Sequence, residues 1–156
     1  MYNGNRARMT TTGHWVTEAI ASLGLGDRVR VLGRSECEAV LAEITAALLE
    51  VPSATFWWSH LKMPSSSWPT ENGYRFIPEI VPTPESPAWF ISGLTDDEKS
   101  VFECAPALVP AIIGECPCFE YAVVDRQLKW IVIENHHDVV IAAGPSAVER
   151  LDRLRQ

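Results

Sequence analysis

The densest group of chemically capable side chains lies at residues 134–138, where the sequence reads Glu-Asn-His-His-Asp. Runs rich in β-branched residues flank this segment, which predicts a position at a hairpin tip or strand end. Alternate residues of an extended strand share a face, so Glu134, His136 and Asp138 would lie together, with His137 on the other side. A histidine beside two carboxylates can carry acid–base chemistry or bind a divalent metal.

The same geometry also favours a structural turn. One short strand leaves the far side of an ion without ligands, whereas zinc sites draw on separated segments. The sequence contains no H-E-x-x-H motif, no G-x-G-x-x-G and no P-loop. We therefore expect a hairpin turn whose polar groups bond the backbone, with no metal and no cofactor. Catalysis by Glu134, His136 and Asp138 is the alternative.

Aromatic side chains supply a second set of candidates, because the chain has six tryptophans. Trp57 and Trp58 are adjacent in an aromatic stretch, residues 55–61, that suits a strand. Neighbours on a strand face opposite sides, so one ring can stay at the surface and serve an interface while the other fills the core. The candidate binding residues are therefore Trp57 and Trp58, with Asn135 and His137 from the polar segment.

The net charge of −7 is concentrated in one stretch of the sequence. Between residues 71 and 125, ten acidic residues stand against two basic ones, a local charge of −8. Such a segment repels nucleic acid and can attract a basic protein. Asp96, Asp97 and Glu98 are its densest part and complete the candidate binding set. The alternative is an acidic surface that only aids solubility.

The elements that position these residues follow from apolar periodicity. Helices are expected over residues 14–23 and 36–50; Leu41, Ile44 and Leu48 share one face of the second. Ser35 and Glu38 match a capping box for that helix. Four further expectations concern the first half of the chain: a short strand or link at 27–32, a strand at 55–61, a loop at 63–73 with an Asn-Gly turn, and a bulged strand at 74–81.

The second half of the chain predicts mainly strands. They are expected at residues 88–91, 119–125, 128–133 and 139–143, the last three as an antiparallel meander. Thr95 followed by three acids predicts a capped helix from Asp96, and a final helix should follow Pro145. The fold class is thus α+β, one mainly antiparallel sheet of about five to six strands with helices at the N- and C-terminal ends.

Composition indicates an ordinary globular protein. Residues 1–12 are polar and predict a flexible leader, and residues 13–156 predict a single domain. No apolar run approaches the roughly 18 residues that span a bilayer, and no signal-peptide pattern is present. Four cysteines without a C-x-x-C pair suit a reducing compartment. We therefore expect a cytoplasmic protein.

Two resemblances bear on function. Glu120-Tyr-Ala-Val-Val-Asp125, followed by Trp130-Ile-Val-Ile-Glu-Asn-His-His-Asp138, resembles the C-terminal signature of a family of small uncharacterised bacterial proteins. The helix–strands–helix order in a small acidic chain is also similar, at the level of fold alone, to bacterial immunity proteins of the Smi1/Knr4 superfamily, although their proline-asparagine-glycine segment is missing here. The second resemblance implies an immunity-type role.

The function expected from these observations is a non-enzymatic bacterial binding module, conceivably an immunity-type protein that masks a basic protein partner with an acidic surface. The alternative is a small metal-dependent or acid–base enzyme, hydrolase-like, centred on Glu134–Asp138. A purely structural or accessory protein is the third possibility. Neither a nucleic acid nor a membrane is expected as a partner, and the sequence leaves the oligomeric state open.

Overall fold

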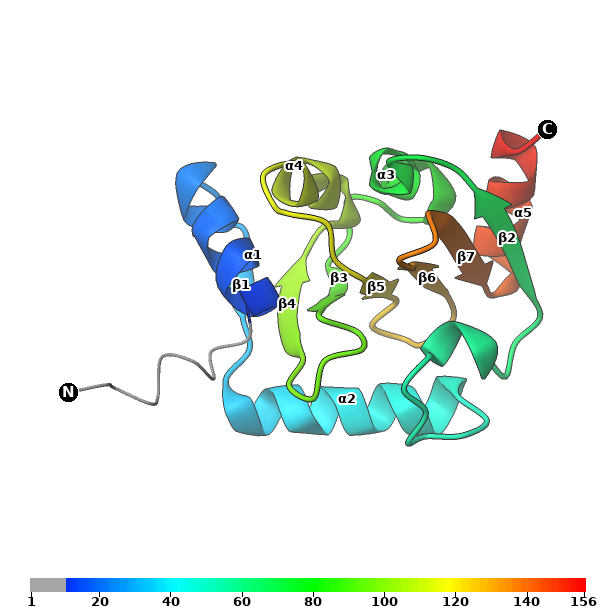
Figure 1. Cartoon of the computed structure of the whole chain (residues 1–156), viewed down its shortest axis with the longest axis horizontal. Helices are drawn as coiled ribbons and strands as arrows, with labels where there is room; N and C mark the ends of the chain where they lie inside the picture. Colours follow the sequence, from blue (N-terminus) through cyan, green and yellow to red (C-terminus); the bar gives the residue numbers. More distant parts are fainter. Residues whose placement is uncertain (1–10) are drawn as a thin grey trace.

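The computed structural model describes residues 11–156 and arranges them around one antiparallel sheet (Figure 1). Its seven strands are hydrogen-bonded in the order β1-β4-β3-β5-β6-β7-β2. Their bounds are β1 (Arg30–Val31), β2 (Ser65–Pro69), β3 (Ala88–Ser92), β4 (Ser100–Cys104), β5 (Tyr121–Val124), β6 (Ile131–Glu134) and β7 (Val139–Ala143). The predicted α+β class is confirmed. The sheet exceeds the expected five to six strands, and β2 and β4 lie where no strand was expected.

Helices cover both faces of this sheet. Their bounds are α1 (Thr11–Ser22), α2 (Arg34–Leu48), α3 (Ile77–Ile80), α4 (Val109–Gly114) and α5 (Pro145–Leu154). Residues 11–156 also contain the short 3-10 helices η2 (Trp57–Ser59), η3 (Gly73–Phe76) and η4 (Pro106–Leu108). Figure 1 shows α2 alone along one side of the sheet and α1, α3, α4 and α5 on the other.

The two faces carry separate apolar clusters because side chains alternate along each strand. The cluster under α1, α3, α4 and α5 includes Phe90, Tyr121 and Val132 of the sheet. The cluster under α2 includes Ile91 and Ile133 from alternate positions of the same strands. Both faces are therefore buried, which accounts for the nearly continuous apolar runs of β5, β6 and β7.

The predicted inner face of α2 is largely confirmed. Ile44 and Leu48 are fully buried against the sheet, whereas Leu41 is half-buried at the edge of the same cluster. The predicted capping box is wrong. The helix begins at Arg34 after an extended Gly33, and no side chain caps it.

Three other local predictions are wrong. The expected strand at 55–61 is the 3-10 helix η2, and the expected strand at 74–81 is η3 followed by α3. The apolar spacing of Ile77, Ile80 and Val81 fits a helical turn as well as a strand, and Pro78 suits its first turn. The expected loop at 63–73 contains strand β2.

The acidic run at 96–98 does not open a helix. It lies in the turn between β3 and β4, where Gly93 adopts φ +68 and the Asp96 N–H donates to the Gly93 carbonyl at 2.9 Å. The chain reverses there within a few residues, so the three acids sit on a hairpin turn.

The predicted flexible leader, residues 1–12, lies outside the described residues except for its last two, which belong to α1. Within residues 11–156, no helix is long and apolar enough to cross a membrane.

Candidate functional site

The polar segment at 134–138 is the turn between β6 and β7. The Asn135 N–H donates to the Val139 carbonyl at 3.1 Å. The Asn135 Oδ1 accepts the N–H groups of His137 at 3.0 Å and Val139 at 3.3 Å. Asp138 adopts the left-handed conformation, with φ +56. Asn135 therefore acts as a turn-forming residue, and its side-chain oxygen faces the backbone.

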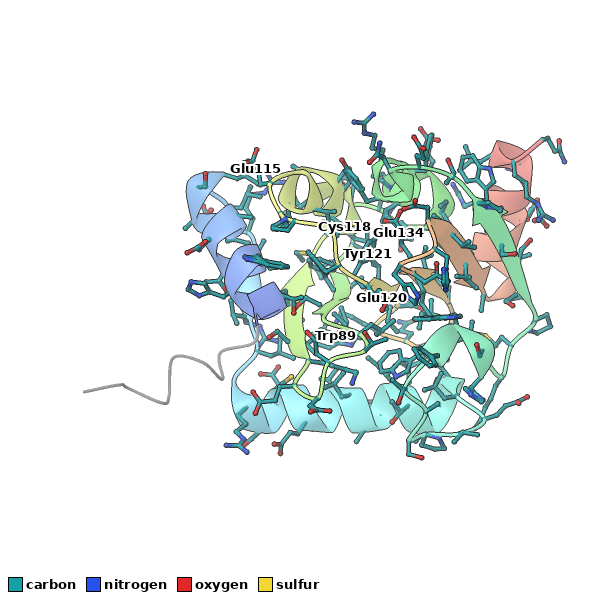
Figure 2. All side chains as sticks on the ribbon, viewed as in Figure 1. Trp89, Glu115, Cys118, Glu120, Tyr121 and Glu134 are labelled. Carbon is teal, nitrogen blue, oxygen red and sulfur yellow. The ribbon has the colours of Figure 1, made fainter. Side chains whose placement is uncertain are left out.

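The structure does not bring Glu134, His136 and Asp138 together. β6 ends at Glu134, so the alternation on which a shared face depends stops there. Glu134 is buried, whereas His136 and Asp138 are exposed. Figure 2 shows Tyr121 beside Glu134, with Glu120 on the α2 side of them.

Glu134 lies in the layer between the sheet and α1, α3 and α4. Its Oε2 accepts the Gly73 N–H at 2.9 Å. Burial raises the pKa of its carboxyl above 4.5, opposed by Tyr121 and by the Gly73 N–H, which favour the charged form. An added Cβ at Gly73 would meet the Val140 side chain, and it would lie 3.0 Å from the Glu134 Oε2. The glycine is needed for this close approach.

Glu134 ends a row of polar side chains inside the apolar layer. Ser92 pairs with Tyr121 and Tyr121 with Glu134 in the strand register. The Ser92 and Tyr121 hydroxyls are buried without a hydrogen-bond partner among residues 11–156. Burial, and secondarily the Glu134 charge, raises the pKa of Tyr121 well above 10, although the two groups fall short of ordinary hydrogen-bond geometry. Such unsatisfied hydroxyls destabilise a fold.

Glu134→Gln is expected to abolish one part of the pH dependence of stability. A carboxyl whose pKa is raised by folding binds its proton more tightly in the folded state. The free energy of unfolding therefore falls as the pH rises from the unfolded pKa through the folded one. The glutamine variant lacks this fall, so its stability relative to the wild type should increase as the pH rises above the unfolded pKa. Urea denaturation across that range measures the difference.

Tyr121→Phe is the control for this prediction. It keeps the buried carboxyl and removes a hydroxyl that favours the charged form of Glu134, so the fall in stability with rising pH should remain and be at least as steep as in the wild type. Parallel pH profiles for Glu134→Gln and the wild type would show that Glu134 has the same pKa in both states.

His136 has a carboxylate partner from the segment that precedes β5. Its Nδ1 lies 2.7 Å from the Oε2 of Glu120, and its backbone N–H donates to the same oxygen at 3.1 Å. The other oxygen of Glu120 accepts the Thr95 hydroxyl at 2.9 Å. Three separate segments thus fix one imidazole and one carboxylate against each other.

Sequence reasoning missed Glu120, because the register between β5 and β6 was not predicted. In the structure Tyr121 pairs with Glu134, which sets Glu120 opposite the first residues of the β6–β7 turn and beside His136.

The two candidate tryptophans differ in burial. Trp57 is 2% exposed and packs in the cluster under α2. Trp58 is half-buried, with its ring centroid 5.3 Å from Phe56 and 6.1 Å from His136. The rings of His136 and His137 are 3.8 Å apart. Trp58 and both histidines therefore share one aromatic surface, whereas Trp57 is a core residue.

The acidic turn between β3 and β4 adjoins the first half of α2. Together they line a pocket of about 410 Å³, whose apolar walls include Val31 and Leu41. Glu38, Asp97 and Glu98 also line it. Asp96 is partly buried instead and accepts the Thr12 hydroxyl at 3.1 Å. Asp97 and Glu98 are therefore available at the surface, whereas Asp96 has a structural role.

Two cations lie in the same pocket. Arg34 contacts Glu38 at 3.3 Å. Lys99 donates to the Asp96 carbonyl at 3.0 Å, and burial lowers the pKa of its amine, although the carboxylates of Asp96 and Asp97 oppose the shift. Within residues 11–156, Asp97 and Glu98 form no ion pair.

The remaining acids of the sequence segment are dispersed over the molecule. Glu103 contacts Arg30 and Arg126, and Glu120 is occupied by His136 and Thr95. The local charge of −8 in the sequence is therefore not one surface. The part that remains concentrated and unpaired is the β3–β4 turn.

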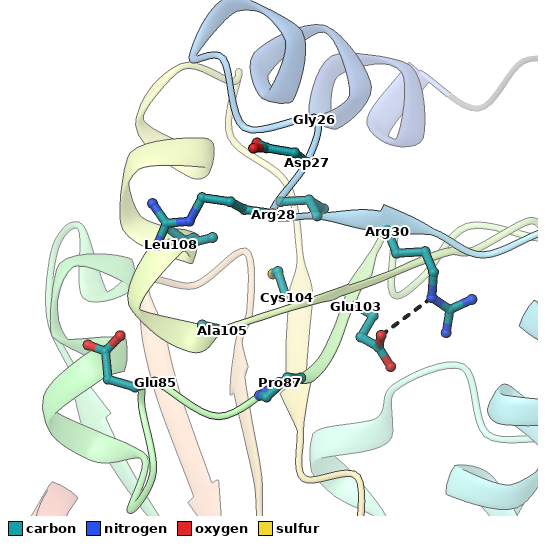
Figure 3. Close-up of a pocket in the computed structure, with 11 residues that line it drawn as sticks. Gly26, Asp27, Arg28, Arg30, Glu85, Pro87, Glu103, Cys104, Ala105 and Leu108 are labelled. Carbon is teal, nitrogen blue, oxygen red and sulfur yellow. Dashed lines mark hydrogen bonds and ion pairs between the residues drawn. The ribbon is translucent and has the colours of Figure 1, made fainter.

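A larger pocket of about 480 Å³ lies at the β1 edge of the sheet (Figure 3). Its charged lining includes Arg28, Arg30, Glu85 and Glu103, and the Arg30 guanidinium bonds Glu103 at 3.3 Å. It contains none of the residues that the sequence indicates for a site. Across residues 11–156, no three His, Cys, Asp or Glu side chains are grouped to hold a metal ion.

A family model described as a family of unknown function (DUF6756) matches residues 15–155. No curated protein and no solved structure matches the chain.

Proposed function

The chain belongs to the family of unknown function DUF6756, and from its surface we propose that it is a binding module for a basic protein partner. The observation that carries the proposal is the pocket between α2 and the β3–β4 turn. It joins apolar walls at Val31 and Leu41 to the unpaired carboxylates of Asp97 and Glu98.

This combination fits a lysine or arginine side chain of the partner. Both residues have an aliphatic stem that packs on apolar surface and a cationic head that seeks carboxylates. Val31 is 51% exposed, so the apolar wall is open to a partner. The two cations in the pocket are already engaged, Arg34 by Glu38 and Lys99 by a backbone carbonyl. Asp97 and Glu98 remain to meet the incoming charge.

An immunity-type role is the specific form of this proposal. A protein that neutralises a toxin must cover a functional surface of it, and many basic surfaces are recognised by acidic ones through long-range attraction. The fold-level likeness to Smi1/Knr4-type immunity proteins, with helices at both ends of an antiparallel sheet, suggests this role by analogy.

The test combines capture with charge reversal. Immobilised protein should retain a basic partner from a lysate of the native host at low salt and release it as salt rises, because exposed charges are screened beyond about 10 Å at 0.1 M. With the purified partner, Asp97→Lys with Glu98→Lys should slow association by about tenfold or more, since such charges mainly steer the encounter. Stopped-flow or biosensor kinetics measure the rate.

Glu79→Lys with Glu115→Lys is the matched control. Both residues are exposed, lie on the α3 and α4 side of the sheet, and change the net charge by the same amount. Equal slowing by the two double variants would reduce the effect to overall charge and reject the pocket as the docking site. Retention of no basic partner at low salt would reject the binding proposal itself.

A further inference from the structure

The surface around His136 has features that a binding role for the β3–β4 turn does not require. Four segments distant in sequence meet there: η2 with Trp58, the β3–β4 turn with Thr95, the residue before β5 with Glu120, and the β6–β7 turn. A turn can be held by its own polar groups, as Asn135 does here. The turn therefore does not need Glu120 or Trp58 to hold its conformation.

Glu120 is positioned as the orienting partner of an imidazole. Its side chain is 11% exposed, against 52% for His136. One oxygen is held by the Thr95 hydroxyl, and the other receives the His136 N–H and Nδ1. A carboxylate only accepts hydrogen bonds, so the Nδ1 proton lies between the two groups and Nε2 remains free. The same order, a fixed carboxylate and an imidazole with a free Nε2, prepares a histidine to take a proton from a nucleophile.

Another histidine–glutamate pair of the chain shows what distinguishes this one. His14 and Glu18, one helical turn apart on α1, are 3.0 Å apart. Their side chains are 49% and 66% exposed, so the carboxylate of that pair is not shielded from solvent. Only His136 combines a shielded, doubly held carboxylate with a neighbouring aromatic wall.

The aromatic wall indicates where a substrate would lie. The Trp58 ring stands edge-on to His136 at 6.1 Å and leads to Phe56, which is 49% exposed. An exposed phenylalanine beside a half-buried tryptophan offers apolar surface to an acyl or aryl group. The side chains that contact His136 bring a negative charge and no Lys or Arg. A neutral substrate is therefore favoured over a phosphate or a carboxylate.

We propose that His136 is a general base for the hydrolysis of neutral carboxylic esters, with Glu120 as its positioning residue and Trp58 and Phe56 as the wall for the apolar group. Nε2 takes a proton from water as the water oxygen bonds to the ester carbonyl carbon. The bond from that carbon to the leaving oxygen then breaks, and the proton passes from Nε2 to the leaving oxygen. The products are a carboxylic acid and an alcohol. No oxidant, reductant or metal is needed.

Hydrolysis of p-nitrophenyl acetate, butyrate and benzoate by the full chain tests the proposal. His136→Ala should lower kcat/KM by about 10²-fold or more, the usual contribution of a general base. Added imidazole should restore part of the lost rate, which a purely structural histidine would not allow. Glu120→Gln should lower kcat at unchanged KM, with recovery in Glu120→Asp, and Trp58→Ala should raise KM.

His14→Ala and Glu18→Gln are the matched controls, because they remove the exposed histidine–glutamate pair without altering the aromatic wall. Both should hydrolyse the esters at the wild-type rate. The proposal is overturned if wild type hydrolyses none of the three esters faster than His136→Ala, or if His14→Ala loses as much rate. It is equally overturned if imidazole rescues nothing. The ester assay uses the purified chain without a protein partner, so the binding proposal fails or survives separately.

Discussion

Replacement of Trp57 by alanine is expected to lower the free energy of unfolding by about 3–5 kcal/mol, the usual range for deleting a buried tryptophan side chain. The ring is 2% exposed and belongs to the cluster between α2 and the sheet. Its segment has few other anchors: η2 is three residues long, and the chain around it is tied to the end of α2 by two backbone bonds, Glu50 to His60 at 2.8 Å and Lys62 to Leu48 at 2.9 Å. The ring is the fully buried anchor of this segment.

Trp58→Ala is the matched control, with the same deletion one residue away. Trp58 is half-buried and rests on Phe56 and His136 at the surface. Its loss should cost clearly less than that of Trp57. Urea denaturation followed by circular dichroism measures both, without relying on tryptophan fluorescence. A loss for Trp58→Ala equal to that for Trp57→Ala would contradict the assignment of core and surface rings.

Gly144→Ala should lower the free energy of unfolding by about 2–5 kcal/mol, because alanine disfavours the positive φ at this position and its Cβ would be too close to neighbouring atoms. Gly144 has φ +97 and joins β7 to α5. A Cβ there would run into the carbonyl oxygen of Lys129 and lie 2.9 Å from the Cα of Trp130. Both of these are backbone atoms of the segment entering β6, so the clash cannot be relieved by a change of rotamer.

Gly26→Ala controls for the loss of glycine as such. No heavy atom lies within 4 Å of a Cβ at Gly26, and its φ is outside the left-handed region. There the substitution should leave stability within about 1 kcal/mol of the wild type, or raise it by restricting the unfolded chain. Thermal or chemical denaturation of the pair gives the comparison; similar losses at both positions would show that the Gly144 contact is not the cause.

The sequence predicted the elements whose apolar pattern admits one interpretation. Residues 119–143 contain β-branched runs separated by polar turns, and the meander β5-β6-β7 follows them. The pattern failed where a few apolar residues fit two periods. Phe76, Ile77 and Ile80 fit a bulged strand and a short helix equally well. The structure has short helices there, η3 and α3, which follow Asn72 at φ +55. A run of acidic residues likewise suits either a helix start or a hairpin turn. The structure has a hairpin turn at Asp96, which Gly93 enters with a positive φ.

The surroundings of His136 could not be predicted from the spacing of residues 134–138. The Trp58 ring, from a distant segment, lies beside the imidazole of His136 in the β6–β7 turn. Its carboxylate is Glu120, because pairing across β5 and β6 brings in a residue 16 positions away while Glu134 turns into the opposite layer. Spacing within one segment cannot reveal which face each neighbour takes after a strand ends. That information resides in the register between strands.

The strand order also determines when β2 can pair during synthesis of the chain. β2 pairs with β7, so Ser65 to Pro69 find their partners only when Val139 to Ala143 have been made. At about 5–20 residues per second, the 74 positions from Pro69 to Ala143 occupy roughly 4–15 s of translation. During that interval the apolar face of α2 and the ring of Trp57 can pack against β3 and β4 once these are made, but not against β5, β6 and β7. Part of the apolar surface of α2 therefore remains uncovered until the last strands of the sheet have been synthesised.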